Sequence, residues 1–180
     1  AALVPVREFS DEKSLIFATR KGTVKKTKLS EYSHVRSNGI RALNIEDGDE
    51  LMDVQVCDAS CDIVLATREG MSIRFHQSDV REMGRATTGV KGIELADEDC
   101  VIGMVVIRRE ATLLVVSEKG YGKRSVLTEY RVQKRGGKGI ITFKVTDKTG
   151  CIVALKEVIP DDELMMITHN GVIIRVPVDG

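Results

Sequence analysis

Basic residues and glycines alternate most densely in one heptad of the chain, Gln133-Lys134-Arg135-Gly136-Gly137-Lys138-Gly139. Glycines let a backbone approach a phosphate closely and expose its N–H groups. The lysines and the arginine supply positive charge, and an arginine can bond a phosphate through two N–H groups. The spacing differs from the Gly-x-x-x-x-Gly-Lys-Ser/Thr loop that binds nucleotides. The heptad therefore indicates either a phosphate-contacting loop or a flexible turn.

The residue types that carry catalysis show no matching pattern. His34, His76 and His169 fall at unrelated positions, and neither Gly-x-Ser-x-Gly nor His-Glu-x-x-His occurs. Tyr32 and Tyr130 each follow a glutamate at corresponding places, which indicates packing rather than a cleavage nucleophile. We expect no catalytic residue, no metal site and no cofactor in this chain.

The four cysteines, Cys57, Cys61, Cys100 and Cys151, lack metal-ligand spacing, so we expect reduced, buried thiols in a cytoplasmic protein. No basic, apolar leader opens the chain, and no initiator methionine does, which suggests a piece of something longer. The longest apolar run, residues 101–107, is far shorter than the roughly 20 residues that span a bilayer. We expect no membrane partner.

One phrase occurs four times: an apolar strand, a short polar turn that ends in glycine, and a second strand that carries basic residues. The four glycines, Gly22, Gly70, Gly120 and Gly171, are separated by 48, 50 and 51 residues. A fixed period near 50 is typical of a repeat architecture. We predict one domain over residues 1–180, with repeats at about 14–60, 61–110 and 111–160 and a partial repeat at 161–180.

Each full repeat carries about four short strand patterns rich in Val, Ile and Thr, bounded by turn residues. In the third repeat these patterns are Thr112–Ser117, Gly122–Ser125, Ile140–Val145 and Cys151–Val158. Four strands in every 50 residues predict an all-β, propeller-like fold. A stack of sheets in a solenoid is the alternative.

The formal net charge of zero conceals a segregated pattern. Residues 20–41 hold seven basic side chains and one acid, whereas residues 42–63 hold seven acids and no base. Residues 119–144 again hold eight bases against one acid. Basic second strands in successive repeats would form a continuous positive band, which suits the phosphates of a DNA duplex. The alternative is a solvated face with no partner.

The heptad closely resembles the box motif of the bacterial DNA gyrase A C-terminal domain, Gln-Arg-Arg-Gly-Gly-Lys-Gly, with Lys134 in place of one Arg. The segments 22–27, 84–92, 120–124 and 164–168 look like successive blades of the same domain. The resemblance implies a β-pinwheel whose blades exchange strands, and a non-catalytic, DNA-wrapping role in an ATP-dependent type II topoisomerase. The heptad lies here in the third visible repeat, whereas the family places its box in the first blade.

The implied partners are double-stranded DNA, bound with little sequence dependence, the rest of gyrase A, and gyrase B. The catalytic tyrosine would lie outside this chain, and removal of Lys25 or Arg135 should weaken DNA binding while barely affecting folding. The alternatives are the equivalent domain of topoisomerase IV and a propeller that binds an acidic protein. The predicted DNA contacts are Lys25, Lys26, Lys28, Arg36, Arg74, Arg85, Lys91, Lys123, Arg124, Gln133, Lys134, Arg135, Gly136, Gly137, Lys138 and Gly139.

Overall fold

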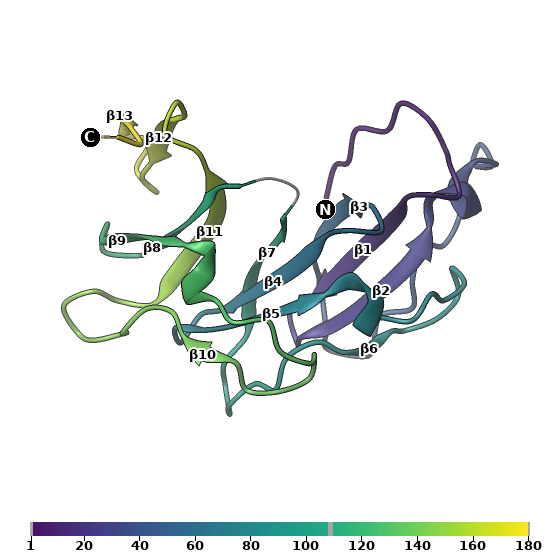
Figure 1. The fold of residues 1–180 in the computed structure, drawn as a ribbon, viewed down its shortest axis with the longest axis horizontal. Helices are drawn as coiled ribbons and strands as arrows, with labels where there is room; N and C mark the ends of the chain where they lie inside the picture. Colours follow the sequence, from purple (N-terminus) through teal and green to yellow (C-terminus); the bar gives the residue numbers. More distant parts are fainter. Residues whose placement is uncertain (1, 108–109, 180) are drawn as a thin grey trace.

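Successive β-hairpins and the strands that flank them build the computed structural model, which describes residues 2–107 and 110–179. Sheet 1 has the strand order β3-β1-β2-β6, sheet 2 the order β10-β5-β4-β7 and sheet 3 the order β11-β8-β9, and β12 and β13 form a C-terminal hairpin. Figure 1 shows them in chain order, with sheet 1 on the right of the view and the hairpin at the upper left. The bounds are β1 Ser14–Thr19, β2 Thr23–Lys28, β3 Leu51–Cys57, β4 Asp62–Thr67, β5 Met71–His76, β6 Val90–Lys91, β7 Val101–Ile107, β8 Thr112–Ser117, β9 Gly122–Val126, β10 Ile140–Ile141, β11 Ile152–Val158, β12 Glu163–Ile167 and β13 Ile173–Pro177.

The third strand of a predicted repeat leaves that repeat and joins the preceding sheet. β6 pairs with β2 in sheet 1, and β10 pairs with β5 in sheet 2, both antiparallel. The expected strand over 140–145 is too long, because β10 ends at Ile141. The chain then turns so that the N–H groups of Thr142 and Phe143 donate to Gly70 O at 2.9 and 3.3 Å. Each exchanged strand therefore ties two neighbouring sheets together.

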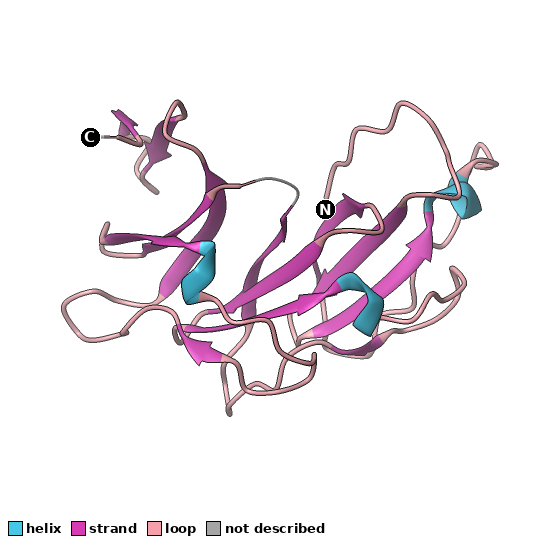
Figure 2. Cartoon of the chain, viewed as in Figure 1, coloured by secondary structure: helices cyan, strands magenta, loops and turns pink. Residues whose placement is uncertain are grey.

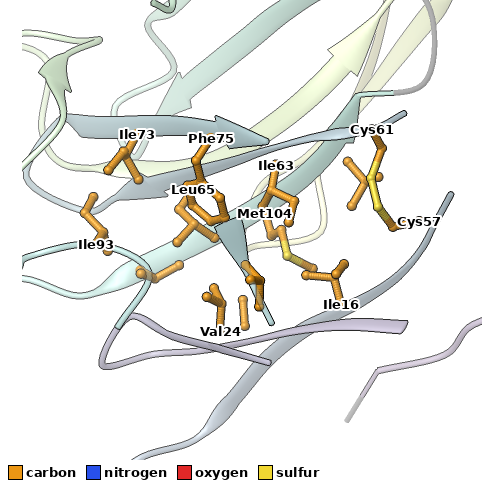
Figure 3. Packing of buried hydrophobic residues seen from close by; sticks show 14 residues of the cluster. Ile16, Val24, Cys57, Cys61, Ile63, Leu65, Ile73, Phe75, Ile93 and Met104 are labelled. Carbon is orange, nitrogen blue, oxygen red and sulfur yellow. A yellow bond between two sulfur atoms is a disulfide. The ribbon is translucent and has the colours of Figure 1, made fainter. Parts of the chain in front are cut away.

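Apolar side chains cover both faces of sheet 2. Successive residues of a strand point to opposite faces, so on β4 Ile63 and Leu65 pack in one cluster with Ile16 of sheet 1. Val64 and Ala66 pack in a second cluster with residues of sheet 3. Figure 3 shows the first of these clusters between the two sheets. The unbroken apolar run of β4 follows from this two-sided burial.

Short 3-10 helices follow the second strand of three hairpins (Figure 2), and their bounds are η1 Leu29–Tyr32, η2 Gln77–Asp79 and η3 Leu127–Glu129. The buried Tyr32 donates from its hydroxyl to Ala42 O at 3.1 Å. The equivalent Tyr130 shares a buried hydrogen bond of 2.6 Å with the Thr142 hydroxyl. Both tyrosines have the packing role that the sequence indicates.

Cys57 and Cys61 are joined in a disulfide, with Cα atoms 6.0 Å apart. The expectation of four reduced thiols is therefore wrong for this pair. The reason is local: β3 ends at Cys57 and β4 begins one residue after Cys61, so the connecting turn brings the two Cα atoms within disulfide range. Figure 3 shows the pair at one end of the core cluster. Cys100 and Cys151 are free thiols.

Within residues 2–107 and 110–179, no helix combines the length and apolar character needed to cross a membrane. The same residues contain no group of three or more His, Cys, Asp or Glu side chains that could hold a metal ion.

Candidate nucleic-acid interface

Three segments, each of which follows a 3-10 helix, lie side by side, and we name them together the loop rim: residues 33–44, 81–94 and 131–139. The second contains β6 and the third leads into β10, which pair with the preceding sheet, whereas the first connects η1 to β3 within sheet 1. Backbone hydrogen bonds join each segment to the next. β6 belongs to the second segment and β10 follows the third, and both strands lie in the lower part of Figure 1. The joining bonds run from Asn44 N to Thr87 O (3.0 Å), from Gly136 N to Gly92 O (2.6 Å) and from Glu94 N to Gly137 O (2.9 Å).

Hydrogen bonds that join the segments of the loop rim recur with the period of the sequence repeat. The Asn44-to-Thr87 and Glu94-to-Gly137 bonds join equivalent residues, since the two donors and the two acceptors are each 50 residues apart. Because one bond recurs at one period, successive segments are held in the same way against their neighbours. Basic side chains on these segments therefore share one continuous edge.

Two glycines allow the crossing strands to approach the preceding sheet. Gly139 has φ +79°, and a Cβ atom there would lie 2.0 Å from Ser72 O. Gly89, the equivalent residue, has φ +123°, and its Cβ would lie 2.5 Å from Val24 O. A side chain fits neither the backbone conformation nor the space. Gly139, a predicted phosphate contact, therefore packs against backbone of the neighbouring sheet.

Exposed basic side chains occupy all three segments of the rim. Arg85 is half-buried, and Lys91 lies 4.0 Å from Glu94. Arg36, Lys134 and Lys138 are exposed and have no ion pair within the described parts of the chain. The exposed members of the set are Arg36, Arg41, Arg81, Lys91, Arg131, Lys134 and Lys138.

A hollow of about 1120 Å³ lies between the first two segments of the rim. Arg36, Arg41 and Arg85 line it, together with polar side chains such as Asn38 and Thr87. Glu31 also lines the hollow, and its carboxylate lies 4.0 Å from Arg85 Nε. Arginine presents several N–H donors to phosphate oxygens, so Arg36 and Arg41 are the lining residues best suited to an anion.

Arg41, Arg81 and Arg131 are the rim arginines that sequence reasoning left out of the predicted contacts. Arg81 and Arg131 directly follow the equivalent buried residues Val80 and Tyr130, at a separation of 50 residues. This recurrence was visible in the sequence. Arg41 belongs to the basic run 20–41, but nothing in the sequence shows that it shares a hollow with Arg85.

Lys25 is 1 % exposed, which contradicts the expectation of an exposed side chain. Its ammonium group donates to Ala42 O at 2.7 Å and to Arg85 O at 2.5 Å, and it lies 5.6 Å from the centre of the Phe17 ring. Burial, and to a lesser degree the nearby Arg85 charge, lowers the pKa of Lys25 to about 8. Lys25 thus ties the first two segments of the rim together from beneath.

Several other basic residues of the second strands also bond within the protein. The Lys26 ammonium donates to the side chain of Gln77 at 2.8 Å, and burial lowers its pKa against the opposite effect of Glu82. Arg74 pairs with Asp62 at 2.7 Å, with the two side chains 18 % and 15 % exposed. Lys28 is half-buried at the end of β2. On β9, Lys123 lies 3.5 Å from Glu129, and Arg124 donates to Val178 O at 2.9 Å.

Within the heptad, too, some residues bond within the protein and others are exposed. Arg135 donates to Asp79 O at 2.8 Å and to Lys91 O at 2.9 Å, which anchors the third segment of the rim. Gln133 N donates to Arg74 O at 2.9 Å. The backbone of Gly136 and Gly137 forms the bonds that join the second and third rim segments. Lys134 and Lys138 remain exposed.

The acidic turns bond the backbone of the hairpin turns. A carboxylate oxygen of Asp49 accepts from Lys21 N at 2.8 Å, and the equivalent oxygen of Asp99 accepts from Glu69 N at 3.0 Å. The segregation of charge in the sequence thus corresponds to two structural roles, since these acids brace hairpins while exposed bases lie on the rim.

A family model described as the DNA gyrase C-terminal domain, beta-propeller, matches residues 13–58, 62–108, 111–157 and 162–180. The DNA gyrase A protein of Lawsonia intracellularis is 46 % identical over 180 residues, which cover 98 % of this chain and 22 % of the relative. The chain therefore spans about a fifth of the length of the curated relatives it matches.

Two solved structures share the fold. The C-terminal domain of DNA topoisomerase IV superposes with a TM-score of 0.90 at 25 % identity, over 97 % of this chain and 55 % of that one. A DNA gyrase A C-terminal domain superposes with a TM-score of 0.85 at 24 % identity, over 96 % of this chain and 58 % of that one. The propeller-like architecture with exchanged strands, expected from the resemblance, is confirmed.

Proposed function

We propose that this chain, which belongs to the DNA gyrase C-terminal domain family, binds duplex DNA along the loop rim and bends it. The observation that carries the proposal is the hydrogen-bonded rim itself, which presents exposed lysines and arginines from three successive segments. A duplex carries one phosphate charge per about 1.7 Å of its axis, so a continuous basic edge suits it better than one isolated patch. The hollow beside Arg36, Arg41 and Arg85 would take phosphate oxygens.

Binding along this rim would depend little on base sequence. The helical elements among the described residues, η1 to η3, are three or four residues long, too short to read a major groove. Contacts to phosphates fix position and orientation without reading bases. Sequence preference would then come from the energy needed to bend the duplex, about 1–6 kcal/mol for a site of 20–30 base pairs.

Salt-dependent DNA binding by charge-matched variants tests the proposal. We expect Lys134→Ala and Lys138→Ala each to reduce the slope of log affinity against log salt by about 0.9, the value for one lost phosphate contact. Lys156→Ala, which removes an exposed lysine of β11 outside the rim, is the control and should leave the slope unchanged. Equal slopes for all three variants and the unmodified protein would contradict the proposal.

The activity of the whole protein follows as a proposal from its relatives, since the chain covers only part of them. As the C-terminal domain of a gyrase A protein, the chain would wrap DNA so that ATP-driven strand passage introduces negative supercoils. Gyrase B and the rest of gyrase A would be its partners in the cytoplasm, and the DNA-cleaving tyrosine would lie outside residues 1–180. Supercoiling of relaxed plasmid by the full-length protein with gyrase B, lost when these residues are deleted, is the expected result.

The likeness to a topoisomerase IV C-terminal domain favours a second candidate. A chain with that role would support relaxation or decatenation. The full-length protein would then show no supercoiling activity, whether or not these residues are present. A third outcome, equal affinity for heparin and duplex DNA without bending, would favour a propeller that binds an acidic partner.

A further inference from the structure

A basic residue stands four positions after the hairpin glycine in all four repeats. These residues are Lys26, Arg74, Arg124 and Arg175. Sequence reasoning assigned the first three to the DNA surface. Their hydrogen-bond partners give them another role.

Three of these side chains reach into the next repeat. The Lys26 ammonium lies 3.3 Å from Gln77 O, Arg74 Nη1 donates to Leu127 O at 2.8 Å, and Arg124 Nη1 donates to Val178 O at 2.9 Å. Gln77, Leu127 and Val178 are equivalent, because each directly follows the second strand of its hairpin. One contact therefore recurs between each repeat and the next, across 51, 53 and 54 residues of chain.

The backbone of the same position holds the next crossing segment. Lys26 O accepts from Met83 N at 2.9 Å, and Arg74 O accepts from Gln133 N at 2.9 Å. Met83 and Gln133 are again equivalent and lie within the loop rim, 50 residues apart. The side chain and the carbonyl of a single residue thus locate both the short 3-10 helix and the rim segment of the following repeat.

These hydrogen bonds between repeats are directional, whereas the packing of the apolar cores is not. The clusters between sheets 1 and 2 and between sheets 2 and 3 are apolar, and apolar burial is non-directional. Hydrogen bonds from a charged donor are short and geometrically demanding. Arg74 is also held from its own sheet by Asp62, with Nε 2.8 Å from the carboxylate, so its guanidinium bridges two sheets in one geometry.

We propose that Lys26 and Arg74 are positioning residues that fix the angle between successive sheets, and through it the curvature of the path that the loop rim offers to DNA. Arg124 holds the C-terminal hairpin to sheet 3 in the same way. This inference rests on the proposed function. These residues act through carbonyl groups of the protein and contact no phosphate.

The test measures DNA bending and retained writhe at saturating protein, using the full-length protein. Arg74→Met should lower the bend, seen by fluorescence transfer between the ends of a short duplex, and the writhe retained in relaxed circular DNA. It should leave the salt slope of binding unchanged. Arg74→Lys should restore part of the bend, because Lys26 makes the equivalent contact in the first repeat.

Two matched variants separate geometry from contact and from folding. Lys138→Met, on the rim, should reduce the salt slope by about 0.9 and leave the bend at saturation unchanged. Lys26→Met, which removes the equivalent contact between the first two repeats, provides the same test if Arg74→Met does not fold. Melting temperatures, measured for every variant, show whether a reduced DNA bend reflects only a loss of folded protein.

An unchanged bend at saturation in folded Arg74→Met or Lys26→Met overturns the inference, and so does a reduced salt slope like that of Lys138→Met. Failure of the proposed function looks different, since the unmodified protein would then neither bind nor bend the duplex.

Discussion

Basic residues that bond within the protein on strands β2 and β5, and exposed basic residues on the loop rim, are alike in sequence and opposite in structure. Lys25 and Arg74 are enclosed by carbonyl groups and a carboxylate of the protein, whereas Lys134 and Lys138 lie exposed with no ion pair to any described residue. A strand inside a stack of sheets has neighbours on both faces, so a charged side chain there must find partners within the protein. A crossing segment at the edge has one side open. For these four residues, the position in the repeat decides whether the charge is bonded within the protein or left exposed.

The largest expected effect on stability comes from removing the side chain of a basic strand residue that is bonded within the protein. Arg74→Ala leaves Asp62 and two carbonyl groups without their partner, and we expect it to lower the free energy of unfolding by about 3 kcal/mol. Urea unfolding measures the change. The matched rim variant Lys134→Ala should stay within about 0.5 kcal/mol of the unmodified protein, as exposed substitutions do. Equal losses of stability for Arg74→Ala and Lys134→Ala would contradict the distinction between internally bonded strand residues and exposed rim residues.

A glycine pair tests how the rim is attached. Gly139→Ala forces a Cβ onto Ser72 O in a left-handed backbone conformation, which alone costs about 1–2 kcal/mol. Gly84, on the same rim, has open space around its Cβ position and no positive φ, so Gly84→Ala should be close to neutral. Thermal unfolding of both variants gives the comparison. A harmless Gly139→Ala would mean that the third segment does not cross against sheet 2 as described.

The pH dependence of stability tests the burial of Lys25. Its pKa is about 8 in the folded chain and 10.5 at its ordinary value, so between these values the unfolded chain binds more protons. Stability should therefore rise as the pH increases from about 8 to about 10.5, relative to Lys25→Met, which does not titrate. Urea midpoints of both proteins at pH 7.5 and 10 measure the difference. A parallel dependence in the two proteins would indicate an ordinary, exposed Lys25.

The smallest effect on folding belongs to Arg41, which lies exposed beside the hollow. We expect Arg41→Ala to change stability by less than about 0.5 kcal/mol and to weaken DNA binding at low salt more than at high salt. Titrations at two salt concentrations measure this, with Lys156→Ala as the control. A loss of affinity that does not vary with salt would argue against a phosphate contact.

The period of the chain, its all-β class and its hairpins were predictable, because apolar alternation and turn glycines are local signals. Lys25 was not predictable, since a polar strand such as residues 23–28 looks solvated until the segments 33–44 and 81–94 are known to cover this side chain. The exchange of β6 and β10 came from the family resemblance and not from the residues, because strand propensity does not say which sheet a strand joins. The heptad was recognised, yet the roles of Arg135 and Gly139 depend on carbonyl groups more than 40 residues away.

Photocrosslinking from the full-length protein to duplex DNA tests the central claim most directly. A benzophenone amino acid at position 36, 91 or 138 places the reactive group on each of the three rim segments, and one at position 156 places it on β11, outside the rim. We predict crosslinks from all three rim positions and none from position 156. Crosslinking from position 156 with silence from the rim would contradict the account.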